Sequence, residues 1–148
     1  METPYKYKAT AYWLLESRGM ASADGVPQAI EFSAPPEFHG EHELWTPEHF
    51  LMAAIASCYI STFRELADAS HFDAVALDVA AEGIMTRDLE YHFSEVTVRP
   101  VLTVATDEDI GPGRILLEKA DFACPVIRSL SCKVNLAPTI QICAAVAV

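Results

Sequence analysis

Two cysteines, Cys58 and Cys124, have the surroundings that bear most directly on chemistry in this chain. Cys58 lies inside an uncharged run from Phe50 to Phe63, where a free thiol is most often a small buried hydrophobe. Its sequence neighbours offer no cation, so a reactive thiolate there needs one delivered by another part of the fold. Packing and catalysis therefore both stay open for Cys58.

Cys124 has a stronger local case. Pro125 suits the first turn of a helix, and Cys124 would then occupy the N-cap, where backbone N–H groups favour a thiolate. Arg128, four residues on, would face the same side. The alternative is a kinked, packed helix in which the cysteine fills space. Local reasoning thus favours Cys124 over Cys58 as the thiolate.

The remaining cysteines and the histidines carry weaker signals. Cys143 falls in the apolar segment TIQICAAVAV, which indicates packing, whereas Cys132 falls in an expected loop and stays open as a third redox partner. His39, His42 and His49 precede the central helix, but the chain has one HxxH and no CxxC pair. Structural zinc sites usually pair close ligands, so we expect solvated histidines, no metal and no cofactor.

Glu48 and Arg18 are candidate partners of the thiol chemistry. Glu48 suits the first turn of a helix, where the helix dipole favours an acid. Ten residues separate it from Cys58, which is about 15 Å along a helix. An arginine would have to bridge that gap, or Glu48 would act from a second subunit. Arg18 is the candidate because a buried Arg–Glu pair supplies charge to a dry pocket; the alternative is a solvated turn residue.

The elements that must position these residues form an α+β order. The central helix follows Thr46 and Pro47, which suit its N-cap and first turn, and should end near Ser70. Its uncharged stretch predicts a helix packed on nearly every side, and is too short to cross a bilayer. Gly83 suggests a bulge, and Pro100 suggests an edge position or a bulge. The other expected elements are strands over 5–15, 20–23 and 28–33 (a meander), a hairpin of strands over 74–86 and 93–106, a second helix over 114–123 kinked at Pro125 with a short restart over 125–130, and a last strand over 135–147 with a break at Pro138.

Length, composition and charge indicate how many domains the chain has and which partners are excluded. The chain of 148 residues is expected to form a single domain over 1–148, and 51% hydrophobic residues supply a core. A net charge of −11 argues against nucleic-acid and anionic-membrane partners, which attract basic patches. The N-terminus lacks a basic region followed by an apolar run, so we expect a cytoplasmic protein whose cysteines start as thiols.

The segment TPEHFLMAAIASC, ending at Cys58, is followed 66 residues later by the pair Cys124-Pro125. Together with EFSAPPEFHGE before the helix, this pattern resembles the OsmC/Ohr family over nearly the whole chain. The resemblance implies an OsmC/Ohr-like fold of N-terminal β-meander, long central helix, β-hairpin, second kinked helix and C-terminal strand. It also implies an intertwined homodimer.

The chemistry implied by the resemblance is reduction of small organic hydroperoxides by thiols, without metal or flavin. Cys58 would be oxidised to a sulfenic acid, and Cys124 would condense with it to an intramolecular disulfide. Glu48 and Arg18 would stabilise the Cys58 thiolate. An external dithiol, a lipoylated protein in the best-known branch, would reduce the disulfide.

An alternative function stays open. The first turn reads Glu16-Ser17-Arg18-Gly19, which departs from the arginine turn of the peroxidase branch. That difference favours a stress-related OsmC-like protein that binds a ligand or senses oxidation without peroxidase turnover. Disulfide formation between Cys58 and Cys124 would argue against the ligand-binding form; sustained turnover with a dithiol would argue against the sensor.

Overall fold

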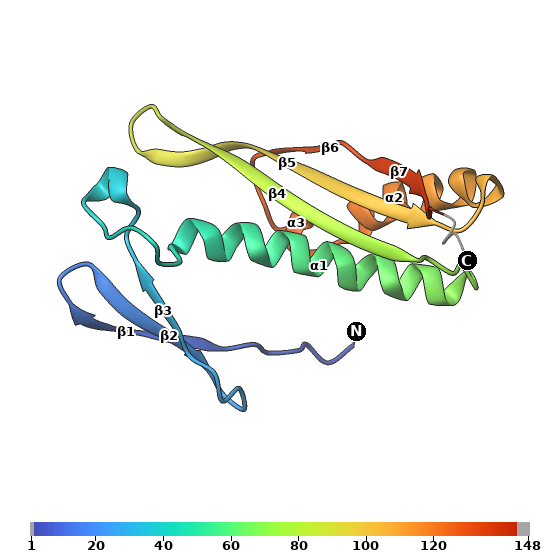
Figure 1. Ribbon diagram of the computed structural model, residues 1–148. Coiled ribbons are helices and arrows are strands. Elements are labelled where there is room, and N and C mark those ends of the chain that lie inside the picture. Colours follow the sequence, from blue (N-terminus) through green and yellow to red (C-terminus); the bar gives the residue numbers. More distant parts are fainter. Residues whose placement is uncertain (1, 145–148) are drawn as a thin grey trace. The chain divides into compact units, whose positions relative to one another are not determined.

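A computed structural model describes residues 2–144 of the chain (Figure 1). The chain divides into two compact units, with the boundary between Leu51 and Met52. In the first unit β1 (Ala9–Leu15), β2 (Arg18–Ala23) and β3 (Ile30–Ser33) form an antiparallel sheet in that order. The predicted meander is therefore confirmed, although its first strand begins at Ala9.

Aromatic side chains connect the meander to the segment before the central helix. After β3 the chain makes a short 3₁₀ turn, η1 (Pro36–Phe38), and returns so that the Ser33 N–H donates to the Trp45 carbonyl at 2.9 Å. The Phe50 ring contacts Phe32 edge-on at 5.9 Å between centroids and stacks on Trp45 at 5.8 Å. These contacts fix the start of the helix within the first unit.

The central helix α1 (Pro47–Ala69) begins and ends close to its predicted bounds. Thr46 caps it: the His49 N–H donates to Thr46 Oγ1 at 3.1 Å, and the Thr46 N–H donates to His49 Nδ1 at 3.1 Å. These two hydrogen bonds satisfy two backbone donors. The His49 side chain takes the part that a Glu has in a capping box. His49, one of the three histidines considered as metal ligands, lies in the first turn of α1 and thus has a structural role.

The expectation that α1 is packed on nearly every side is wrong within this chain. One stripe at helical spacing is buried: Ile55, Tyr59, Phe63 and Ala67. The other faces are half-buried or exposed although they carry small and apolar residues. At 23 residues, α1 is also long and apolar enough to span a bilayer, a test that core helices pass as well.

In the second unit β4 (Ala76–Arg87) and β5 (Tyr91–Val104) form the predicted hairpin. The predicted last strand is two short strands, β6 (Lys133–Leu136) and β7 (Thr139–Ile142), with the break at Pro138. Both pair with β5 in parallel, one after the other along its length (Figure 1). Positions 145–147 of the predicted strand lie outside the described residues.

Pro100 occupies neither an edge strand nor a bulge, because β5 has partners on both sides. The Val98 and Val104 carbonyls accept from Ala137 and Cys143, so the even-numbered residues of β5 direct their polar groups toward β6 and β7. The missing N–H of Pro100 therefore points at the joint between β6 and β7, where no ladder bond is lost.

Gly83 is needed for space and does not mark the bulge. The irregularity in the hairpin lies between Ile84 and Met85. A Cβ at Gly83 would come within 2.7 Å of the Phe93 ring, so the strand pairing tolerates only glycine there without movement.

The second helix, α2 (Ile110–Ala123), starts earlier than predicted, after a 3₁₀ turn, η2 (Asp107–Asp109). It ends at Cys124, and the short helix α3 (Pro125–Arg128) restarts as predicted. Helix α2 approaches the sheet closely at Gly113, whose added Cβ would lie 2.8 Å from Leu102. The core of the second unit comprises Ile55, Tyr59, Phe63, Ala67, Val96, Val98, Leu102, Val104, Leu116, Leu117, Ala120, Cys124 and Ile127.

The Thr46 cap can be tested by substitution. Thr46→Ala removes the acceptor of the His49 N–H, and we expect the free energy of unfolding to fall by about 1 kcal/mol. Thr46→Ser keeps the hydroxyl and should stay close to wild type. Urea unfolding followed by circular dichroism measures both; equal losses in the two variants would contradict the cap.

Candidate functional site: the Cys58 and Cys124 thiols

The structure brings Cys58 and Cys124 together. Cys58 lies in the middle of α1 and is half-buried, whereas Cys124 lies between α2 and α3 and is fully buried. Both are free thiols, and Cys58 lies close enough to Cys124 to raise the pKa of that thiol. Residues 66 positions apart in the chain therefore form one redox-capable pair.

The environment of Cys124 holds it as a neutral thiol. Burial raises its pKa above the ordinary cysteine value, and the neighbouring Cys58 raises it further. The backbone N–H groups of Ile127 and Val126 lower the pKa, as helix-end reasoning anticipates, but burial outweighs them. The predicted N-cap position of Cys124 is confirmed, and the local preference for it as the thiolate is not supported.

Tyr59, directly after Cys58, fastens α1 to α2. Its Oη donates to the Leu117 carbonyl at 2.7 Å, and its side chain is fully buried. Burial, followed by the nearby Asp121 and Cys124, raises the Tyr59 pKa, so the phenol stays neutral. A buried hydroxyl needs such a partner, because an unpaired one costs stability.

Asp121 is a second ionisable group near Tyr59. It precedes Cys124 by three residues on α2, which places both on one helix face. Its Oδ1 atom is buried and has no hydrogen-bond partner among the described residues. Burial raises the pKa of this carboxyl. Sequence reasoning missed both Tyr59 and Asp121; the signals were their spacings of one and three residues from the two cysteines.

Arg18 and Glu48, the other predicted site residues, both lie in the first unit. Arg18 Nε is 3.0 Å from Glu41 Oε2 and 3.3 Å from Glu31 Oε1. Glu48 lies in the first turn of α1, and its Oε2 atom is buried with no hydrogen-bond partner within residues 2–144. No ion pair joins Arg18 to Glu48 in that part of the chain. A buried carboxylate oxygen without a partner is costly and marks Glu48 as unusual.

The remaining cysteines flank strands β6 and β7, each of which pairs with β5. Cys132 is half-buried immediately before β6, and Cys143 is exposed immediately after β7. Cys143 Sγ lies 3.7 Å from the Ala144 carbonyl. The sequence-based expectation that Cys143 is a packing residue inside a strand is therefore wrong, because the strand ends at Ile142.

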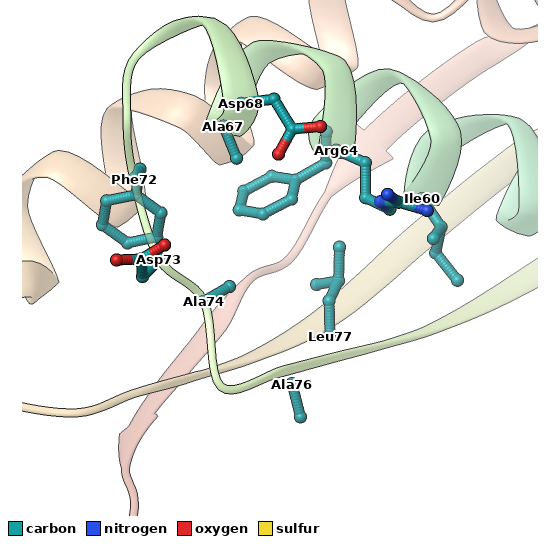
Figure 2. A pocket seen from close by; sticks show the side chains of 10 residues that line it. Ile60, Arg64, Ala67, Asp68, Phe72, Asp73, Ala74, Ala76 and Leu77 are labelled. Carbon is teal, nitrogen blue, oxygen red and sulfur yellow. The ribbon is translucent and has the colours of Figure 1, made fainter.

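A hollow in the second unit lies away from the thiols. It has a volume of about 320 Å³ and lies between the C-terminal half of α1, the following loop and β4 (Figure 2). Phe63 and Phe72, in edge contact at 6.5 Å, form part of its wall beside Arg64, Asp68 and Asp73. Among the described residues neither Cys58 nor Cys124 lines it, so the thiol chemistry has a different location.

The differences in burial predict an order of thiol labelling. With iodoacetamide at neutral pH, we expect Cys143 to be alkylated first and Cys124 last. Because the pKa of Cys124 is raised, its thiolate fraction at a given pH is below that of an ordinary thiol, and its labelling should require a higher pH. Peptide mass mapping over time and pH measures this order; Cys124 labelled as fast as Cys143 would contradict it.

Comparison with known proteins agrees with this geometry. A family model described as OsmC-like protein matches residues 40–138, more than half of the chain. The Bacillus subtilis (strain 168) protein YmaD is 28% identical over 109 residues, covering 70% of this chain and 72% of its own length. The resemblance inferred from the cysteine spacing is therefore confirmed.

Solved structures show the same fold. An OsmC-like protein of Vibrio cholerae superposes with a TM-score of 0.80 at 18% identity, covering 91% of this chain and 99% of its own. An organic hydroperoxide resistance protein of Elizabethkingia anophelis gives 0.76 at 20% identity over 97% and 100% of the two chains. The corresponding protein OhrB of Bacillus subtilis gives 0.68 at 15% identity over 93% and 98%. The chain, with its α+β OsmC/Ohr fold, belongs to the OsmC-like family.

Proposed function

We propose that this protein reduces organic hydroperoxides by a two-cysteine mechanism. The observation that carries the proposal is the proximity of the half-buried Cys58 thiol to the fully buried Cys124 thiol. Membership of the OsmC-like family and the fold shared with hydroperoxide resistance proteins support the same role. In this proposal the more accessible Cys58 reacts with the peroxide, and the buried Cys124 then reacts with oxidised Cys58.

In the proposed reaction the Cys58 thiolate attacks the terminal oxygen of a small organic hydroperoxide. The O–O bond breaks, the alcohol leaves with a proton, and Cys58 becomes a sulfenic acid. The Cys124 sulfur then attacks Cys58 Sγ, the S–O bond breaks, and water leaves as the disulfide forms. An external dithiol, such as a lipoylated protein, returns both thiols by exchange.

Arg18 and Glu48 are proposed to stabilise the Cys58 thiolate. The ion pairs of Arg18 with Glu31 and Glu41 engage its Nε atom, and a guanidinium has further N–H donors at its terminal nitrogens. The unpartnered Glu48 oxygen is a ready acceptor for such donors. Since all three ion-paired side chains are partly exposed, exchanging these partners costs little.

We also propose that the chain works as one OsmC-like domain over 1–148 within a cytoplasmic, intertwined homodimer. Much of the apolar surface of α1 lacks a cover in the single chain. All seven residues of β1 are exposed as well, with Trp13 at 79% and Leu15 at 64%. Exposed apolar surface of this kind marks protein interfaces, and a second copy would cover it.

The two-cysteine reaction predicts a specific mass change. After one equivalent of cumene hydroperoxide the wild type should lose two hydrogens, with the new bond mapped to Cys58–Cys124. Cys58→Ser should abolish peroxide consumption, because the residue that attacks the peroxide is gone. Cys124→Ser should still be oxidised at Cys58 and stop at a sulfenic acid that dimedone traps.

The outcome separates the candidate functions. Disulfide formation with sustained turnover on dihydrolipoamide supports the peroxidase. A disulfide without turnover would indicate a redox sensor, and the survival of all four free thiols would indicate a ligand-binding protein. Unchanged peroxide consumption by Cys58→Ser would exclude the proposed mechanism.

The homodimer is tested at β1. Leu15→Arg places a charge on the exposed apolar strand, and we expect the dimer to dissociate at micromolar concentration. Leu89→Arg, at the exposed hairpin tip between β4 and β5, is the matched control and should leave the dimer intact. Sedimentation equilibrium measures the mass; a monomeric wild type would overturn the dimer.

A further inference from the structure

Tyr59 lies close to both Asp121 and Cys124, and Cys124 lies close to Cys58, so two helices bring four ionisable side chains into one region. Cys58 and Tyr59 come from α1, and Asp121 and Cys124 come from the C-terminal end of α2. The proposed two-cysteine reaction uses the thiols and leaves Tyr59 and Asp121 without a role. Asp121 is the unexplained member, since it has a buried carboxylate oxygen with no hydrogen-bond partner within residues 2–144.

Backbone geometry places Asp121 at this cluster. The Tyr59 hydroxyl bonds to the Leu117 carbonyl, which is also the α-helical acceptor for the N–H of Asp121. The Tyr59 hydroxyl therefore lies near the backbone N–H of Asp121. Cys124 follows three residues later on the same helix face, and its thiol lies close to Cys58.

We propose that the Asp121 carboxylate accepts the proton of the Cys124 thiol when that thiol closes the disulfide with oxidised Cys58. The inference rests on the proposed function, because it assigns a residue to its second step. As the Cys124–Cys58 S–S bond forms, the S–H bond of Cys124 breaks and its proton passes to Asp121. The S–O bond of Cys58 breaks in the same displacement, and the departing hydroxide takes the proton from Asp121 and leaves as water.

The local electrostatics fit this role. Burial raises the pKa of Cys124, so the thiol keeps its proton at neutral pH and needs a base to react quickly. Burial also raises the pKa of Asp121, which makes it a stronger base than an exposed aspartate. Tyr59, whose pKa is raised, stays protonated and holds the helices in place.

The charged and apolar groups of the neighbouring elements have contacts of their own. The buried side chains of β5, which α2 meets at Gly113, eight residues before Asp121, are apolar: Val96, Val98, Leu102 and Val104. Arg128, from α3, donates to the Phe122 carbonyl and lies over the Phe122 ring at 5.1 Å. The ionisable groups that the described residues place near Tyr59 and the thiols are Asp121, Cys124 and Cys58, and Glu118 on the same helix is exposed.

The test separates the two chemical steps in a Cys132→Ser, Cys143→Ser parent that keeps only the thiol pair. The parent and its Asp121→Asn variant are mixed rapidly with cumene hydroperoxide, quenched with dimedone and weighed intact. We expect Cys58 oxidation at the parental rate, but disulfide closure slower by about 100-fold, the lower end of general-base effects, with trapped sulfenic acid accumulating. Glu118→Gln removes an exposed acid from the same helix and should behave as the parent.

The pH profile gives a readout that a purely structural role would not change. In the parent the closure rate should rise with pH as Asp121 loses its proton, and then level off. In Asp121→Asn that rise should disappear, and closure should accelerate only at the higher pH where Cys124 itself ionises. Asp121→Glu keeps a carboxylate and should recover part of the rate.

Folding is checked by thermal unfolding. Because the Asp121 pKa is raised in the folded state, the stability of the parent should decline as pH rises past the ordinary aspartate pKa. The Asn variant lacks this penalty and should be at least as stable at pH 7. Closure at the parental rate with the parental pH profile in Asp121→Asn would overturn the inference.

Failure of the proposed function gives a different result. In that case cumene hydroperoxide leaves Cys58 of the parent unoxidised. Cys58 is then loaded with dithiodipyridine, and thiopyridone release by Cys124 is followed directly, which needs no peroxide. Slower release in Asp121→Asn supports Asp121 as the proton acceptor, and equal release overturns it.

Discussion

The buried hydrogen bond from Tyr59 to the Leu117 carbonyl is the constraint on which the thiol site depends. A fully buried phenol must find a partner, and the carbonyl it selects belongs to the last turns of α2. This hydrogen bond fixes how α1 is positioned along α2. Cys58, one residue before Tyr59, and Cys124, one turn beyond Asp121, consequently meet.

The sheet supports α2 near its N-terminal end, at Gly113. β5 is lined on its inner face by valines and leucine, and Gly113 lets the helix approach that face without a clash at Leu102. Pro100 fits inside the sheet because β6 and β7 meet opposite it. A proline in a central strand is normally excluded, so the split of the last strand and the position of Pro100 explain each other.

Elements with strong local signals were predictable from the sequence. The Thr46-Pro47 start, the apolar run of α1 and the Cys124-Pro125 restart of a helix all follow from short-range rules. The burial of one stripe of α1 and the position of Pro100 were not, since both depend on which segments become neighbours. The cysteine spacing identified the family because it is a property of the chain alone.

The thiol environments show where local reasoning stops. The N–H groups of Val126 and Ile127 do lower the pKa of Cys124, as the N-cap position predicts, but burial outweighs them. Burial is a long-range property, and so is the approach of Asp121 to Tyr59. Neither can be obtained from neighbours in sequence.

Cys124 is fully buried and Cys58 is only half-buried, and this difference has a consequence for the proposed reaction. A buried thiol that keeps its proton reacts poorly with peroxide, so oxidation is directed to the half-buried Cys58. The same protonation would delay disulfide closure and leave the sulfenic acid exposed to further, irreversible oxidation. A site that protects its second cysteine by burial therefore needs a base at that cysteine. Asp121 is the carboxylate that the fold places within one helical turn of it.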